Sequence, residues 1–137
     1  MTQIAKGSFE IKLQPRLFED AIPKWKLGRM SIDKQITGDL VATTKGQMLT
    51  AMGEINGSAG YVAIERVVGT LHGKKGSFVL QHNGFMNRGA PWLSVVVVPD
   101  SGTEELVGIA GEFKIDIVAG KHLYEFSYRL PESKQTG

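Results

Sequence analysis

Glu65 is the residue of this chain whose surroundings best suit acid–base chemistry. Its neighbours on both parities of an alternating segment are aliphatic: Val62, Ala63, Ile64, Val67 and Val68. Burial among apolar side chains raises the pKa of a carboxyl group, which would suit Glu65 to act as a general acid or base near neutral pH. The alternative is that Glu65 forms a structural ion pair with Lys34 or a nearby arginine, since ion pairs also perturb pKa values.

His82 is the second candidate catalytic residue, as a proton shuttle or an orienting partner of Glu65. Two alternatives stay open for it. His82 is a core histidine with both ring nitrogens hydrogen-bonded, or it lies at the rim, because Asn83-Gly84 is a strong hairpin signal.

Further polar residues share the more apolar parity of their strands and are therefore expected to face inward: Lys34, Thr44, Tyr61, Ser94, Tyr124 and Tyr128. The three tyrosines would give a cavity aromatic walls with polar tips, which suits an amphipathic ligand. Equally, they fill the interior and pin it by hydrogen bonds. Trp25 and Trp92 either cap a barrel mouth, pack over the core or form a subunit contact.

Metal and cofactor sites are not expected. The chain has no cysteine, and His72, His82 and His122 lack the spacing of metal ligands. The Gly57–Gly60 stretch precedes a strand pattern rather than a helix, so it does not predict a phosphate-binding loop.

The elements that must position these residues are strands. In Gly76–Asn87, for example, Phe78, Leu80 and His82 alternate with polar residues. Alternation of this kind indicates a sheet with one buried face. About eight such segments, separated by Gly-rich breaks, predict an all-β fold: one eight-stranded antiparallel meander barrel, because closure removes unpaired strand edges.

The predicted strands cover 9–13, 30–36, 40–52 with an interruption at Gly46, 61–71, 76–87, 93–98, 113–117 and 122–130. The stretch from Arg16 to Lys26 is expected to be a long connection with a helical turn near Leu17–Ala21. All 137 residues form a single domain, with its core at about 6–130 and a loose tail at 131–137.

The composition of the chain limits the classes of partner that it is expected to bind. A net charge of +2, with basic and acidic residues interspersed, argues against nucleic acid, and no stretch is long and apolar enough for a membrane helix. The start of the chain lacks the apolar core of a signal peptide, so a cytoplasmic location is the default.

The valine run Val95–Val98 is too apolar to face water on either side, which predicts an apolar outer strand face and a homo-oligomer.

Five stretches resemble one known family: Leu27–Gln35, Gly60–Val67, Gly76–Gly84, Val97–Leu106 and Gly120–Phe126. The chain is similar, from roughly Lys6 to Leu130, to a bacterial domain-of-unknown-function family whose fold looks like the allene oxide cyclase barrel. The resemblance implies a barrel shaped like a plant fatty-acid cyclase and bacterial polyketide cyclases. It implies no activity, since the family is uncharacterised. Glu10 is the nearest counterpart of the glutamate that allene oxide cyclase places inside its barrel, but its parity opposes that of Phe9 and Ile11.

These observations predict a barrel that binds a small, mostly apolar or amphipathic molecule. If it is an enzyme, isomerisation or cyclisation without a cofactor is expected, because such reactions need a moulded, water-excluding cavity and one or two acid–base groups. Glu65 would then act as the acid–base group, with His82 as its partner. The alternatives are a non-catalytic carrier of the lipocalin type and a structural, oligomer-forming barrel with a filled interior.

Overall fold

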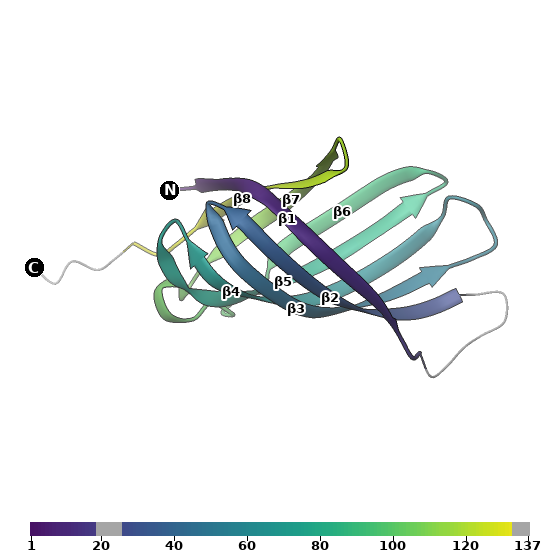
Figure 1. Cartoon of the computed structure of the whole chain (residues 1–137), viewed down its shortest axis with the longest axis horizontal. Coiled ribbons are helices and arrows are strands. Elements are labelled where there is room, and N and C mark those ends of the chain that lie inside the picture. The colour runs from purple at the N-terminus through teal and green to yellow at the C-terminus, as the bar shows by residue number, and fades with distance from the viewer. Residues whose placement is uncertain (19–25, 133–137) are drawn as a thin grey trace, which may run out of the picture.

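Eight antiparallel strands follow one another along the chain and close into a barrel (Figure 1). The computed structural model describes residues 1–18 and 26–132. The strands are β1 (Gln3–Arg16), β2 (Lys26–Gly38), β3 (Leu40–Met52), β4 (Ala59–Leu71), β5 (Lys74–Asn87), β6 (Ala90–Val97), β7 (Ala110–Val118) and β8 (Lys121–Arg129). A single 3-10 turn, η1 (Glu104–Leu106), lies between β6 and β7. The predicted all-β meander barrel is therefore confirmed.

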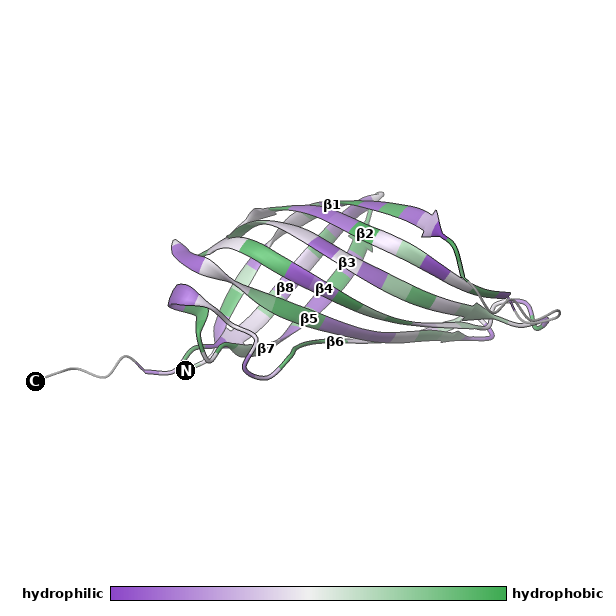
Figure 2. Cartoon of the chain, turned by 90° about the horizontal axis from the view of Figure 1, so that it is seen from below, coloured by the Kyte–Doolittle hydropathy of each residue, from purple (hydrophilic) through white to green (hydrophobic). Residues whose placement is uncertain are grey.

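Side chains alternate between the interior and the outside of the barrel, as the sequence pattern predicts. On β2, Ile32, Lys34 and Ile36 are buried, whereas Gln35 between them is exposed. Figure 2 shows the same alternation as green and purple bands along neighbouring strands. Because directly paired residues of adjacent strands share a face, the register decides which inward residues meet.

One end of the barrel is closed by the segment that connects β6 to β7. Thr103 donates its backbone N–H to the carbonyl of Ser77 (2.9 Å), and its side-chain oxygen accepts a bond from the Ser77 N–H (3.0 Å). These bonds hold η1 against β5, so that Leu106 and Ile109 join the buried core. The N-terminus and the end of β8 lie at this side of the molecule (Figure 1).

We call the opposite end, which carries the β3–β4 and β5–β6 connections, the open end, because the inward side chains of residues 1–18 and 26–132 become more exposed toward it. Along β1, exposure of the inward side chains rises from 5% at Phe9 to 41% at Leu13. Along β6 it is 7% at Val97 and 4% at Val95, and it reaches 42% at Leu93. The core therefore fills the closed half, while apolar side chains of the other half remain accessible.

The barrel also has a weak seam along its length. Strands β6 and β7 share one cross-strand pair, Val96 with Glu112, whereas β4 and β5 are paired along their whole length. Toward the open end, β6 pairs only with β5 and β7 only with β8. Side chains therefore have to cover this gap.

One local expectation was wrong, and of the two alternatives left open for His82 the rim position is not formed. β3 is continuous through Gly46 instead of being interrupted there. Asn83-Gly84 lies inside β5, and the turn comes at Arg88 and Gly89, whose φ angles of 48° and 91° suit a two-residue hairpin. His82 is consequently a mid-strand residue. The helical turn expected at Leu17–Ala21 and the position of Trp25 lie wholly or partly outside the described residues.

No helix among residues 1–18 and 26–132 has the length and apolar composition needed to cross a bilayer.

Candidate functional site

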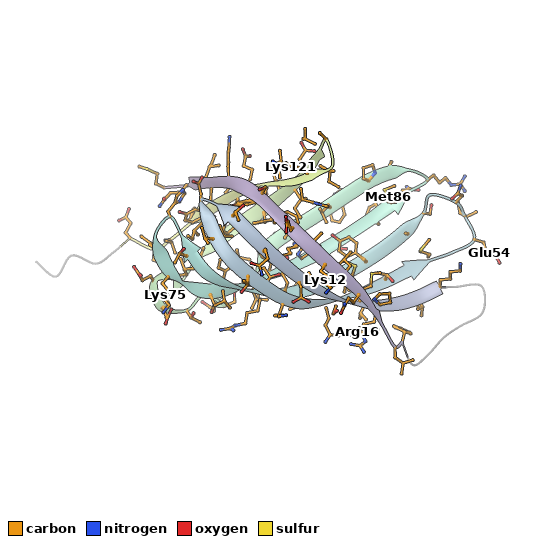
Figure 3. All side chains as sticks on the ribbon, in the orientation of Figure 1. Lys12, Arg16, Glu54, Lys75, Met86 and Lys121 are labelled. Carbon is orange, nitrogen blue, oxygen red and sulfur yellow. The ribbon has the colours of Figure 1, made fainter. Side chains whose placement is uncertain are left out.

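Three inward-facing polar residues meet inside the barrel. The Lys34 Nζ lies 2.8 Å from Glu65 Oε1, and the His82 Nε2 lies 2.6 Å from the same oxygen. All three residues are buried, at 3%, 0% and 4% exposure for Lys34, Glu65 and His82. Lys12, Lys75 and Lys121, labelled in Figure 3, are by contrast exposed on the outside. We refer to Lys34, Glu65 and His82 as the buried cluster.

Each member of the buried cluster comes from a different strand. Lys34 is on β2, Glu65 on β4 and His82 on β5, so the Lys34–Glu65 contact crosses over β3. The residue of β3 opposite Glu65 is Gly46. A Cβ at Gly46 would lie 2.6 Å from the Glu65 Cβ and 2.3 Å from the Ile64 carbonyl oxygen. Glycine therefore leaves the space in which the Glu65 side chain lies.

The pKa of Glu65 moves in the direction opposite to the expected one. Burial alone would raise the pKa of this carboxyl group, but the hydrogen bond with His82 and the positive charge of Lys34 outweigh burial and lower it to about 2. Glu65 is therefore ionised at neutral pH. The structural ion pair with Lys34, considered above as the alternative, is formed.

The buried cluster retains unmet hydrogen-bonding capacity. Glu65 Oε2 and Thr44 Oγ1 are buried and have no partner among the described residues. The ammonium group of Lys34 is further held 4.7 Å from the ring centroid of Phe9, within cation–π range. The cluster thus consists of charged side chains in largely apolar surroundings. One oxygen of its carboxylate, a strong acceptor, has no partner among the described residues.

His82 is oriented by Glu65. Because Glu65 is ionised and only accepts, the His82 nitrogen facing it, Nε2, is the donor of this hydrogen bond. In the tautomer protonated at Nε2, Nδ1 is an acceptor. The ring of Tyr61 lies 6.2 Å from that of His82, centroid to centroid. Burial, together with the charge of Glu65, raises the pKa of Tyr61, so this phenol stays protonated.

Tyr124 and Tyr128 are at the closed end, away from the accessible half. The Tyr124 hydroxyl donates to the Thr37 carbonyl (2.7 Å) and accepts a bond from the Leu40 N–H (3.1 Å), which fastens the β2–β3 turn. The Tyr128 hydroxyl contacts His72 Nδ1 and Gln3 Oε1. These hydrogen bonds are those expected of the pinning role, and ligand binding by either tyrosine stays a prediction.

Ser94 faces outward, contrary to the inward expectation. It pairs with the exposed Asn83, whereas its neighbour Val95 pairs with the buried His82. The sequence of β6 does not show which of its residues face inward, because valine occupies both faces of this strand. Val95 and Val97 point into the barrel, and only Val96 and Val98 of the run are available outside.

A groove of ≈ 420 Å³ opens beside the single β6–β7 pair. Its lining comes from both faces of the two strands: Trp92, Leu93, Ser94, Val95, Glu112, Phe113, Lys114 and Ile115. Ser94 is thus a groove residue although it is not an interior one. Because inward and outward side chains both line the groove, it runs between the strands, and its wall at Val95 adjoins His82 across β5 and β6.

Other residues considered as functional lie apart from the buried cluster. Glu10 is exposed on the outer face of β1, as its parity indicates. Trp92 is 46% exposed and stacks on Phe85, with ring centroids 5.0 Å apart. Within the described part of the chain, no group of three or more His, Asp or Glu side chains is placed to hold a metal ion.

Sequence reasoning missed Gly46 and Phe113. Gly46 was interpreted as a break, although a lone glycine within a strand also signals close approach of a neighbour. Phe113 packs against Tyr124 and lies 6.0 Å from Lys34, so it separates the β6–β7 groove from the cluster. No sequence signal distinguishes Phe113 from other core aromatics.

Comparison with known proteins agrees with this fold. Residues 5–128 match the family model described as "Protein of unknown function (DUF3224)". The chain is similar to a crystal structure of a protein of unknown function from the DUF3224 family of Shewanella oneidensis MR-1, with 46% identity and a TM-score of 0.92 over 97% of this chain and 100% of that one. No curated protein matches. The chain belongs to the DUF3224 family of proteins of unknown function.

Proposed function

We propose that this barrel binds a small, mostly apolar molecule in the groove between β6 and β7. The observation that carries the proposal is the single cross-strand pair, Val96 with Glu112, beside which the groove opens. Its ≈ 420 Å³ falls within the roughly 300–1,000 Å³ that small-molecule sites occupy. The inward side of the groove is apolar, from Leu93, Val95 and Phe113, which suits a hydrocarbon skeleton.

The polar end of the ligand is directed toward His82. Val95 forms the groove wall on β6 and pairs with His82 on β5, so the imidazole lies behind that wall, whereas Ser94, Glu112 and Lys114 are the polar residues that line the groove itself. Glu65 Oε2 and Thr44 Oγ1 are further buried oxygens that have no hydrogen-bond partner among the described residues. A hydroxyl-bearing amphipathic molecule would satisfy such acceptors, and no cofactor is required for its binding.

Proton transfer is a second candidate function, favoured by the 2.6 Å contact between His82 Nε2 and Glu65 Oε1. An ionised carboxylate fixes the tautomer of an imidazole and stabilises its protonated form. His82 Nδ1 would therefore take a proton from one ligand atom and return it to another, as in isomerisation or cyclisation. In this proposal His82 is the acid–base residue and Glu65 the positioning residue, because a carboxyl with a pKa of about 2 is a weak base.

Binding is tested with the neutral apolar dye Nile red and two tryptophan variants. Ser94→Trp places a large ring in the groove, whereas Thr43→Trp places one on an exposed position of β3 outside it. We expect dye binding by wild type and Thr43→Trp, and at least a tenfold weaker affinity for Ser94→Trp. Equal affinity of both variants would contradict the groove as the site, and no binding by wild type would favour the filled, structural barrel.

Catalysis is tested separately from binding. Native mass spectrometry of the purified protein identifies a retained small molecule, and that molecule is then incubated with wild type and Glu65→Gln. Conversion by wild type, with a lower rate and an altered pH profile for Glu65→Gln, supports proton transfer by His82. Unchanged ligand with both proteins supports a carrier.

A further inference from the structure

We propose that the side-chain amine of Lys34 forms a Schiff base with the carbonyl group of a small apolar aldehyde or ketone. This role rests on the proposed function, because the carbonyl compound has to reach Lys34 from the β6–β7 groove. Lys34 takes no part in the proton transfer described for His82. It is nevertheless the only lysine buried among residues 1–18 and 26–132, with 3% exposure. Buried lysines are the ones that serve as Schiff-base nucleophiles.

The ammonium group of Lys34 has donors to spare. It carries three N–H donors, and its one hydrogen-bond partner within the described part of the chain is Glu65 Oε1, at 2.8 Å. The ring of Phe9, with its centroid 4.7 Å away, offers only its π face. A buried ion pair stabilises a fold only where further hydrogen bonds occupy the remaining donors and acceptors. The pair of Lys34 and Glu65 is incomplete in this respect, and a carbonyl oxygen would accept from the free N–H donors.

Two unpartnered oxygens belong to the immediate neighbours of this amine. Thr44 is the direct cross-strand partner of Lys34, and Glu65 Oε2 belongs to the carboxylate that binds the amine. Both Thr44 Oγ1 and Glu65 Oε2 are buried without a hydrogen-bond partner among the described residues. A carbonyl oxygen can only accept, but it becomes a donor once it is converted to a hydroxyl group and then to water. The two oxygens could accept from it at that stage.

The condensation conserves both protons and charge. After Lys34 gives up a proton, its nitrogen forms a bond to the carbonyl carbon, and the electron pair of the C=O bond moves to the oxygen. The C–O bond then breaks as water leaves, so that R–NH₃⁺ and O=CR₂ become R–NH⁺=CR₂ and H₂O. Both hydrogens of the water come from the ammonium group. Because the iminium product keeps the positive charge of Lys34, the Glu65 carboxylate remains its counter-ion.

His82 is placed to carry these protons from nitrogen to oxygen. Its Nε2 and the Lys34 Nζ bind the same oxygen of Glu65, at 2.6 and 2.8 Å. Imidazole is the side chain best suited to taking up and returning a proton near neutral pH. The buried cluster therefore holds a nucleophile, a counter-ion and a proton carrier.

One aromatic ring separates the amine from the β6–β7 groove. Phe113 lines this groove, and its ring centroid is 6.0 Å from the Lys34 Nζ. If the ring turns aside, a carbonyl group can reach the nitrogen while the hydrocarbon part of the ligand stays against Leu93 and Val95 in the groove. An iminium ion is destroyed by water, so the apolar surroundings favour its retention.

Reductive trapping in the wild-type protein tests the proposal. The probe is trans-cinnamaldehyde with sodium cyanoborohydride, which reduces an imine to a stable secondary amine, and the chain has no cysteine to compete for the aldehyde. Peptide mass spectrometry compares Lys34 with Lys45, which is exposed and is also paired with a carboxylate, that of Asp33. We expect labelling of Lys34 to be at least tenfold faster than that of Lys45 in the folded protein, and equal labelling of the two in urea. Labelling of Lys34 no faster than that of Lys45, or a preference that persists in urea, overturns the proposal.

The two tryptophan variants of the dye experiment test the route of entry. Ser94→Trp, in the groove, should slow the labelling of Lys34 at least tenfold, whereas Thr43→Trp should leave it unchanged. Equal rates in the two variants overturn entry through the groove. Nile red binding by wild type without preferential trapping at Lys34 overturns the Schiff base and leaves the proposed function intact. Absence of both dye binding and trapping overturns the two together.

Discussion

Gly46 and Glu65 are direct cross-strand partners, and the absence of a side chain at Gly46 gives the buried carboxylate its place. A Cβ at this position would lie 2.6 Å from the Glu65 Cβ, closer than non-bonded carbon atoms approach. Because Glu65 contacts Lys34 across β3, the glycine lets an ion pair form between strands that are not adjacent. The buried ion pair of Lys34 and Glu65 thus depends on the absence of a Cβ at position 46.

Gly46→Ala is expected to destabilise the fold by about 1–3 kcal/mol, since either the Ile64 backbone or the Glu65 side chain must shift. Gly60→Ala is the matched control on β4, because the nearest atom to a Cβ there is 3.9 Å away. Urea unfolding followed by circular dichroism measures both. If Gly46→Ala lowered the free energy of unfolding no more than Gly60→Ala, the proposed clash of a Cβ at position 46 would be contradicted.

Lys34→Met is expected to cost about 3–5 kcal/mol, because it leaves the Glu65 carboxylate buried without its cation. Lys45→Met removes the lysine of the exposed Lys45–Asp33 pair and is expected to change the free energy of unfolding by less than about 1 kcal/mol. The double variant Lys34→Met/Glu65→Gln should lose less than the sum of its two single variants. Additive losses would show that Lys34 and Glu65 are not coupled.

Acid is expected to destabilise the protein through Glu65. Its pKa is about 2 in the folded protein and 4.5 in the unfolded chain, so between these values only the unfolded state binds the proton. The stabilisation is complete above about pH 5 and is lost as the pH falls through 4.5 toward 2, on the order of 3 kcal/mol in all. Urea unfolding at a series of pH values checks this, and Glu65→Gln should show a shallower acid dependence. An unchanged slope in that variant would assign the acid sensitivity to other carboxyl groups.

Tyr124→Phe is expected to lower stability by about 1–3 kcal/mol, since it leaves the Thr37 carbonyl and the Leu40 N–H without the hydroxyl that joins them. Nile red affinity should not change, because Tyr124 is at the closed end. Tyr61→Phe serves as the comparison at the open half. A loss of dye affinity in Tyr124→Phe, without a loss of stability, would return Tyr124 to the ligand-binding residues.

The strand pattern by itself determined the barrel and most of its interior. Period-two alternation decides which residues share a face, so it predicts Lys34 and Glu65 inside the barrel and leaves His82 either inside or at the rim. The assignment failed at Ser94 because alternation carries no information in a strand that is apolar on both faces. The turn signal at Asn83-Gly84 left the place of His82 open, and the strand pairing that continues past these residues decides it.

Only the tertiary structure decided what the interior residues do to one another. A pKa depends on the balance between burial and neighbouring charges, and the neighbours of Glu65 come from β2 and β5, 31 and 17 residues away in the chain. The β6–β7 groove depends in the same way on how two strands diverge, which their separate sequences do not encode. Local pattern fixes the facing of each side chain, whereas long-range register fixes which charges meet.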